Sequence, residues 1–179
     1  MPSKVKLMLG CGPLPIHQQH LEYVDNSWTL IDAYINEPSI VKMDIRKLDY
    51  PNESVEQIYC SHTLEHISLK EIAPTLAEWY RVLELKGQVV INVPDMEWLS
   101  EEMLRLALQE EPRSKVFTTQ QKLMEVIYGN QDHEGEYHKC GFTQFTLGEA
   151  LIRAGFRHIE VERVYEAHDM GCLLAKAIK

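Results

Sequence analysis

Short apolar segments, separated by longer polar or helical stretches, constrain the fold of this chain more than any other feature. Each is rich in β-branched or other apolar residues and is followed within two residues by glycine or a polar side chain. Five of them occur in the first part of the chain: Val5–Leu9, Trp28–Ile31, Ile40–Met43, Gln57–Cys60 and Gln88–Val93. Such segments are typical of strands in a mostly parallel sheet whose two faces are both covered. The sequence therefore predicts an α/β fold.

Two helices are predicted from capping boxes. The pattern Ser68-x-x-Glu71 opens a helix that ends near Lys86-Gly87, and Thr146-x-x-Glu149 opens a second helix that Gly155 ends. The apolar residues of each helix recur on one face, as in helices that cover a sheet. After them, two more strands are expected to pair as an antiparallel hairpin at one edge of the sheet: Ile159–Val164 and Cys172–Ile178.

The stretch between the fifth strand and the second capping box contains no obvious strand. Asp95 is expected to cap a helix that Pro112 ends, and a second helix is expected from about Ser114 to Gly129. Residues 129–141 are polar and rich in titratable groups, which predicts a loop near the site. We therefore expect one domain over residues 1–179, with a helical and loop insertion at about 96–142 that forms a substrate lid.

Charge and cysteine content restrict the partners and the location. With 27 acidic and 18 basic residues the chain carries a formal net charge of -9, which repels phosphate backbones and anionic lipid. We expect neither a nucleic-acid nor a membrane partner. The four cysteines show no paired spacing, as expected for reduced thiols in the cytoplasm. The first apolar segment is too short for a signal peptide or a membrane span.

The residues that follow the predicted strands define a candidate ligand site. In doubly wound sheets, ligands bind outside the carboxyl ends of the strands. Gly10-Cys11-Gly12 would let a ligand lie against the backbone, although a tight turn alone also explains it. Asp32 lies 22 residues after Gly10, a spacing suited to a carboxylate that accepts from two ribose hydroxyls. Asp44 and Ile45 could contact an adenine amino group and ring. The agreement of several strand ends favours a nucleoside ligand.

Pro15 helps to choose among nucleoside ligands. A dinucleotide fingerprint needs a third glycine at that position, so that a helix N-terminus can receive a pyrophosphate. A nucleoside without phosphates fits better, and S-adenosylmethionine (SAM) is one, with a sulfonium charge suited to an acidic pocket. The sequence therefore predicts SAM as the cofactor and disfavours a nucleotide-dependent oxidoreductase.

The chain also resembles the class I SAM-dependent methyltransferases, most of all a bacterial and archaeal group known mainly as predicted methyltransferases. The resemblance covers nearly the whole chain and rests on three stretches: Lys6-Leu-Met-Leu-Gly-Cys-Gly12, Cys60-Ser-His-Thr-Leu-Glu-His66, and Arg81-Val-Leu followed by Gly87 and Val-Pro-Asp95. It implies a three-layer Rossmann-like fold with a mostly parallel seven-stranded sheet and an antiparallel last strand.

The resemblance also implies roles for single residues. Gly10 and Gly12, with Cys11 between them, would lie under the methionine moiety. Asp32 would bind the ribose, Asp44 and Ile45 the adenine, and Ser61 would lie beside the sulfonium. Two positions depart from the family pattern: Met8 stands where an acid is usual, and Leu14 where a third glycine is usual.

Methyl transfer is an in-line displacement that often needs a base to remove a proton from the acceptor. Histidine suits that role near neutral pH. We rank His62 and His138 first as catalytic residues; His66, His133, Asp95 and Tyr137 follow. A zinc site drawn from Cys60, His62, His133, His138 and Cys140 lacks the usual ligand spacings, so no metal is expected.

The function that these features favour is methyl transfer from SAM to an oxygen or nitrogen of an unidentified small molecule. The alternative is a catalytically degenerate SAM-binding module that regulates a partner protein. Met8, Leu14 and the short segment between Gly12 and Trp28 favour that alternative, whereas the titratable groups of Asp132–His138 favour catalysis. The oligomeric state stays open and allows a homodimer.

Overall fold

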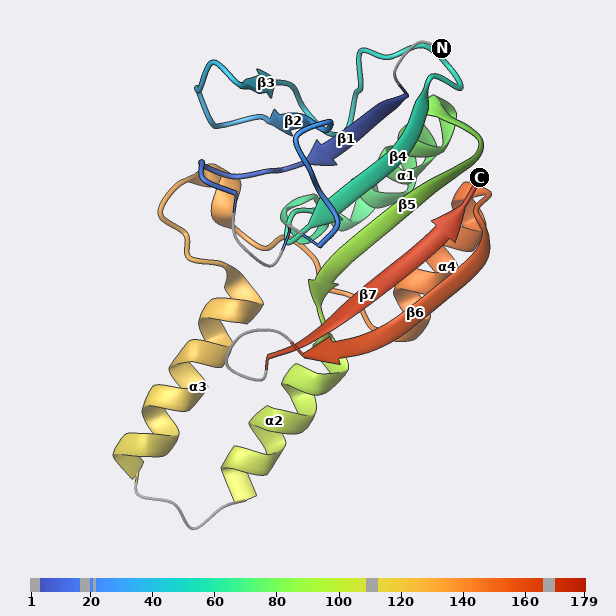
Figure 1. Ribbon diagram of the computed structural model, residues 1–179. Helices are drawn as coiled ribbons and strands as arrows, with labels where there is room; N and C mark the ends of the chain where they lie inside the picture. The colour runs from blue at the N-terminus through green and yellow to red at the C-terminus, as the bar shows by residue number, and fades with distance from the viewer. Residues whose placement is uncertain (1–3, 17–19, 21, 109–112, 166–169) are drawn as a thin grey trace.

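A single mixed sheet organises the computed structural model, which describes residues 4–16, 20, 22–108, 113–165 and 170–179, with the backbone alone for 113–118. Within these residues the sheet has seven strands in the order β3-β2-β1-β4-β5-β7-β6 (Figure 1). Their bounds are β1 Val5–Leu9, β2 Thr29–Asp32, β3 Ile40–Lys42, β4 Val55–Ser61, β5 Leu83–Pro94, β6 Arg157–Tyr165 and β7 Gly171–Ile178. Strands β1 to β5 pair in parallel, and β7 runs antiparallel to β5 and β6. The predicted sheet and its edge hairpin are confirmed.

Helices α1 (Leu69–Val82) and α4 (Gln144–Ala154) pack side by side on one face of the sheet (Figure 1). Their buried side chains and alternate residues of the strands form the main core. Tyr80 of α1 packs edge-to-face on Phe156 just after α4, with ring centroids 5.3 Å apart. This contact joins the two helices at the end of the sheet away from the pocket described below.

Helix α1 begins where predicted, after Ser68, but without the predicted capping box: the Ser68 side chain makes no capping hydrogen bond. Its predicted end near Lys86-Gly87 is wrong, because the helix stops at Val82 and Leu83 is already extended. Leu83 pairs with Val55 of the neighbouring strand. Strand pairing therefore outweighs helix propensity in residues 83–86.

Helix α4 starts earlier than predicted. Thr143 is the N-cap, and its side chain accepts from the Thr146 N–H at 3.2 Å while Thr146 Oγ1 accepts from the Thr143 N–H at 2.9 Å. The capping box is therefore formed by Thr143 and Thr146. Thr146 occupies the N3 position of the helix and not the N-cap position that was predicted for it. Gly155 ends the helix with φ of +103°, as predicted.

On the opposite face of the sheet, described residues of the stretch between Gly12 and β2 pack on the strands, and the described part of this stretch contains no α-helix. Tyr23 stacks on Tyr59 of β4 with ring centroids 5.0 Å apart, and His20 Nδ1 lies 3.1 Å from the Tyr59 hydroxyl. Met8 is 1% exposed and belongs to the same apolar cluster. The residue that stands in place of the usual acid is thus part of the core.

Helices α2 (Met96–Leu108) and α3 (Arg113–Tyr128) form a hairpin that projects beyond the carboxyl ends of the strands (Figure 1). Leu99, Leu106 and Leu123 form its buried seam. Both helices were predicted, with α3 starting one residue earlier, and Pro112 lies outside the described residues. Among the described residues, no helix combines the length and apolar character that a membrane crossing requires.

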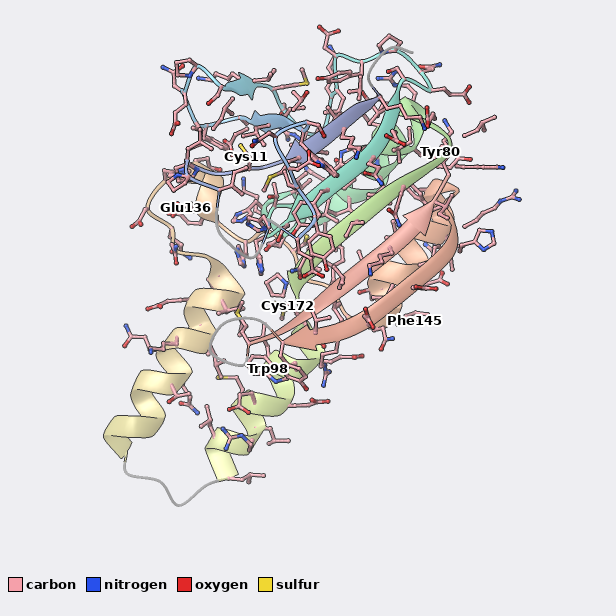
Figure 2. All side chains as sticks on the ribbon, in the orientation of Figure 1. Cys11, Tyr80, Trp98, Glu136, Phe145 and Cys172 are labelled. Carbon is pink, nitrogen blue, oxygen red and sulfur yellow. The ribbon has the colours of Figure 1, made fainter. Side chains whose placement is uncertain are left out.

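The two ends of the segment that carries the hairpin meet just beyond the end of β5. Asp95 forms a parallel bridge with Phe142, whose carbonyl accepts from the Met96 N–H at 2.9 Å. Asp95 caps α2, as predicted, because its Oδ1 accepts from the Glu97 N–H at 2.9 Å. Trp98 of α2 lies against the start of β7, near the labelled Cys172 (Figure 2). The hairpin thus leaves and rejoins the sheet at the same point.

Candidate active site

Two glycines with left-handed backbone form the turn after β1. Gly10 has φ of +69° and Gly12 of +66°, a region that residues with side chains rarely adopt. The Gly10 N–H donates to the Ile31 carbonyl at 2.8 Å, which ties the turn to β2. A Cβ on Gly10 would lie 2.2 Å from Thr63 Oγ1, whereas a Cβ on Gly12 would meet no described atom within 4 Å. Packing therefore requires Gly10, and Gly12 borders open space.

Asp32 connects this turn to the loop after β2. Its Oδ2 accepts from the Gly12 N–H at 3.0 Å, and its Oδ1 accepts from the N–H groups of Tyr34 and Ile35 at 2.8 and 3.1 Å. The residue is only 8% exposed. The carboxylate thus fixes the conformation of both loops at one side of the pocket.

Asp44 and Ile45 follow β3, where they were predicted to meet a ligand. Arg46 donates to both oxygens of Asp44 and, at 2.9 Å, to Glu71. The hydrogen bond from Arg46 is the main cause that lowers the pKa of Asp44. Ile45 is buried, and its carbonyl accepts from Trp79 Nε1 at 2.8 Å. Asp44 is therefore ionised near neutral pH, beside a guanidinium that the sequence did not single out.

Ser61 and His62 end β4. Ser61 is 4% exposed, and its hydroxyl has no hydrogen-bond partner among the described residues. His62 has φ of +47°, and its N–H donates to the Asn92 carbonyl at 2.8 Å. The left-handed backbone follows directly after the strand, and the His62 side chain lines the pocket.

Next to them lies a buried acid surrounded by three histidines. Glu65, in the short 3-10 helix η2 (Leu64–His66), is 1% exposed, and its Oε1 lies 3.5 Å from His62 Nδ1. Burial raises the pKa of Glu65, but His62, His66 and His138 together outweigh burial and leave the pKa lowered. Burial lowers the pKa of His138. The His66 and His138 rings meet edge-to-face with centroids 4.6 Å apart.

The polar loop of residues 129–141 folds back onto this cluster. The N–H groups of Lys139 and Cys140 both donate to the Glu65 carbonyl, at 2.8 and 3.2 Å. In the middle of the loop, Gly135 of the short 3-10 helix η3 (Glu134–Glu136) packs so closely on the Tyr34 ring that a Cβ would lie 2.5 Å from it. The loop is therefore close to the site, as predicted, and bridges the ends of β2 and β4.

These segments enclose a pocket of about 290 Å³ at the carboxyl ends of the strands. Several predicted residues line it: Gly10, Gly12, Asp32, Asp44, Ile45, His62, His66 and His133. Glu136, labelled in Figure 2, lines it from the polar loop. The pocket has the small size and mixed polar lining of a site for a small ligand.

Other predicted residues lie outside the lining of this pocket. Cys11 and Ser61 are buried beside it, His138 lies behind His66, and Tyr137 is 40% exposed. Asp95 is 1% exposed, and its Oδ2 pairs with Arg163 Nε at 2.5 Å, so its contacts hold β5, α2 and β6 together.

The four cysteines are free thiols, as expected. Burial raises the pKa of Cys11 and of Cys140 to about 12, and it also raises that of Cys60. These three are therefore protonated near neutral pH and are poor nucleophiles.

Sequence reasoning missed Glu65, Tyr34 and Arg46. Glu65 lies in the stretch Cys60–His66, but the sequence analysis assigned it no function. Acidic residues are rarely buried, so its type gives no sign of a place inside the protein. The burial of Glu65 depends on residues 139–140, more than 70 positions away in the chain. No local pattern signals such a contact.

Comparisons with known proteins agree with this fold. Residues 7–91 match the family model of a methyltransferase domain. No curated protein matches the sequence. Many solved structures match the fold, and three of them illustrate the likeness.

One is 1,6-didemethyltoxoflavin-N1-methyltransferase of Burkholderia thailandensis, solved with 1,6-didemethyltoxoflavin and S-adenosylhomocysteine (TM-score 0.63, 18% identity, 98% of this chain and 70% of that chain). The second is a SAM-dependent methyltransferase of Archaeoglobus fulgidus (TM-score 0.64, 16% identity, 99% of this chain and 87% of that chain). The third is a possible histamine N-methyltransferase of Thermotoga maritima (TM-score 0.63, 15% identity, 100% of this chain and 84% of that chain).

At these identities the structural likeness establishes the fold, which is that of the class I SAM-dependent methyltransferases. Together with the family match, it confirms the resemblance inferred from the sequence motifs and supports SAM as the cofactor.

Proposed function

We propose that this chain binds SAM in the pocket at the strand ends and transfers its methyl group to an oxygen or nitrogen of a small-molecule acceptor. The observation that carries the proposal is the convergence of Gly12, Asp32 and Ile45 on one pocket, within the segment that matches a methyltransferase domain. These residues follow three different strands, as a site at a topological switch point requires.

In this proposal Gly10 and Gly12 lie under the methionine moiety, because the open space beside Gly12 lets a ligand approach the backbone. Asp32 binds the ribose through Oδ2, which accepts one hydrogen bond from the protein and keeps capacity for a hydroxyl. Asp44 and Ile45 meet the adenine. Ser61 would lie beside the sulfonium, and its buried hydroxyl has no hydrogen-bond partner among the described residues.

The acceptor enters from the side of the polar loop, where His62, His133 and Glu136 line the pocket. His62 is the first candidate to take a proton from the acceptor, and His138 is the second. Residues 96–142 form the substrate lid of a single domain over residues 1–179, since they supply this wall of the pocket and the helical hairpin beyond it.

Calorimetric titration of the purified chain with SAM, S-adenosylhomocysteine and NAD tests the cofactor. The expected result is binding of the first two without binding of NAD. If neither SAM nor its product binds, the proposal is wrong.

Gly12→Ala should weaken SAM binding by about tenfold, equivalent to about 1.4 kcal/mol. The new methyl group occupies the open space where the ligand would lie, and the residue must keep φ of +66°. Gly148→Ala is the matched control. Gly148 lies inside α4, and its new Cβ would make only an ordinary contact, 3.9 Å from the Val161 side chain. The control should bind SAM normally and gain about 0.5–1 kcal/mol of stability. Equal affinity in both variants would remove Gly12 from the binding site.

His62→Asn should leave SAM affinity nearly unchanged but slow formation of S-adenosylhomocysteine by roughly 100-fold once an acceptor is found. Asparagine tolerates the left-handed backbone of this position but cannot act as a base. The control is His158→Asn, because His158 is an exposed residue of the edge strand with φ of +48°. Turnover equal to that of the control would exclude His62 from the mechanism.

A further inference from the structure

Glu65 is an anomaly in the described structure. Its side chain is almost fully buried, and neither carboxylate oxygen has a hydrogen-bond partner among the described residues. Taking a carboxylate out of water costs several kcal/mol unless charge or hydrogen bonds compensate. The 3.5 Å contact with His62 Nδ1 is long for a hydrogen bond. Both carboxylate oxygens therefore keep their capacity to bind a positive ligand.

Two imidazoles stand next to this carboxylate in a suitable arrangement. Ligand atoms of Glu65, His66 and His138 all lie within 4.8 Å of one another. His66 Nδ1 is buried and, like the carboxylate, has no hydrogen-bond partner among the described residues. Donors on one tetrahedral zinc ion, bonded at about 2.0–2.2 Å, lie roughly 3.3–3.6 Å apart, so side-chain rotations must bring these atoms closer by about 1 Å to close the site.

We propose that Glu65, His66 and His138 bind one divalent transition-metal ion at the wall of the pocket. Two imidazoles and one carboxylate suit zinc and related ions, whereas magnesium and calcium prefer oxygen ligands. Of the zinc ligands considered from the sequence, only His138 belongs to this set.

The backbone holds the three ligands together without help from an ion. The N–H groups of Lys139 and Cys140 bind the Glu65 carbonyl, so that the residue next to His138 in the chain is fixed on η2. The His138 N–H in turn donates to the Tyr128 carbonyl at 3.0 Å, at the end of α3. A site preorganised in this way loses little conformational entropy on binding an ion.

His66 belongs to both the cluster and the pocket wall. Three protein ligands leave at least one coordination position open. Resting on the proposed function, the inference gives that position to an oxygen of the methyl acceptor, which the ion would orient toward the methyl group. Acceptors with a hydroxyl or carboxylate beside the methylated atom are therefore favoured.

The test is metal analysis of the purified chain after chelator treatment and dialysis against zinc. We expect one equivalent in the wild type and in His158→Asn, and about 100-fold weaker binding in Glu65→Gln and His138→Asn. Zinc should also raise the melting temperature of the wild type and of His158→Asn, but not that of Glu65→Gln or His138→Asn. His138→Asn keeps the test decisive if Glu65→Gln fails to fold. Zinc affinity unchanged in His138→Asn, or no stoichiometric zinc in the wild type, would overturn the site.

Two further measurements separate the parts of the inference. SAM titration of the metal-free wild type tests the proposed function independently, because the SAM residues named above are not ligands. Cobalt-loaded protein should change its visible spectrum when acetohydroxamate, an oxygen chelator, is added. A bound cobalt ion whose spectrum does not respond would show that the ion is closed to the acceptor and would refute that contact.

Discussion

Asp32→Ala is expected to weaken SAM binding by about 100-fold or more, equivalent to about 2.7 kcal/mol. The substitution removes the proposed ribose ligand and also frees the N–H groups of Gly12, Tyr34 and Ile35. Hydrogen bonds to a charged group contribute roughly 1.5–3 kcal/mol each, so the loss of three also loosens the walls of the pocket. Calorimetric titration with SAM measures the effect.

Asp32→Asn separates the two contributions. Its amide oxygen can still accept from Tyr34 and Ile35, but its NH₂ group faces the Gly12 N–H and cannot accept from it. We expect an intermediate affinity. Asp25→Ala is the control, because Asp25 is exposed and binds only Ser27 among the described contacts. SAM affinity that is the same in Asp32→Ala and Asp25→Ala would exclude the ribose role.

Trp79→Ala should lower the free energy of unfolding by about 3–5 kcal/mol. Trp79 is fully buried between α1 and the sheet, and its indole N–H donates to the Ile45 carbonyl at 2.8 Å. The substitution creates a large cavity and removes the donor from a carbonyl beside the pocket. Denaturant unfolding followed by circular dichroism measures the loss.

Two variants serve as comparisons for this prediction. Trp79→Phe keeps most of the buried ring but not the N–H, so it should cost less than the alanine variant. Phe145→Ala removes an aromatic residue of α4 that is 72% exposed and should change stability by less than about 0.5 kcal/mol. Similar losses in Trp79→Ala and Phe145→Ala would contradict the packing described for α1.

The strands of a mostly parallel sheet and the convergence of the cofactor residues could be predicted because both follow from local patterns. Each short apolar segment folds as a strand, and the parallel arrangement brings Gly12, Asp32 and Asp44 to one edge of the sheet. The glycine turn was predictable from residue type alone, since φ values near +66° strongly favour glycine.

The sequence could not predict features that depend on distant contacts. The end of α1 is set by the pairing of Leu83 with Val55, and a glycine four residues later suggested the wrong boundary. The start of α4 moved because a threonine pair can close a capping box without glutamate. The cluster of Glu65 with His138 forms only because the polar loop returns to η2 after the helical hairpin.

The bridge between Asp95 and Phe142 has a consequence for how such a chain can diversify. The segment that carries α2 and α3 begins and ends at neighbouring points of the sheet. The entropy of closing this long loop therefore changes only slowly with its length. Helices can be lengthened, shortened or exchanged there while the seven strands keep their register. New acceptor preferences can therefore evolve at this junction without the cofactor half of the molecule having to refold.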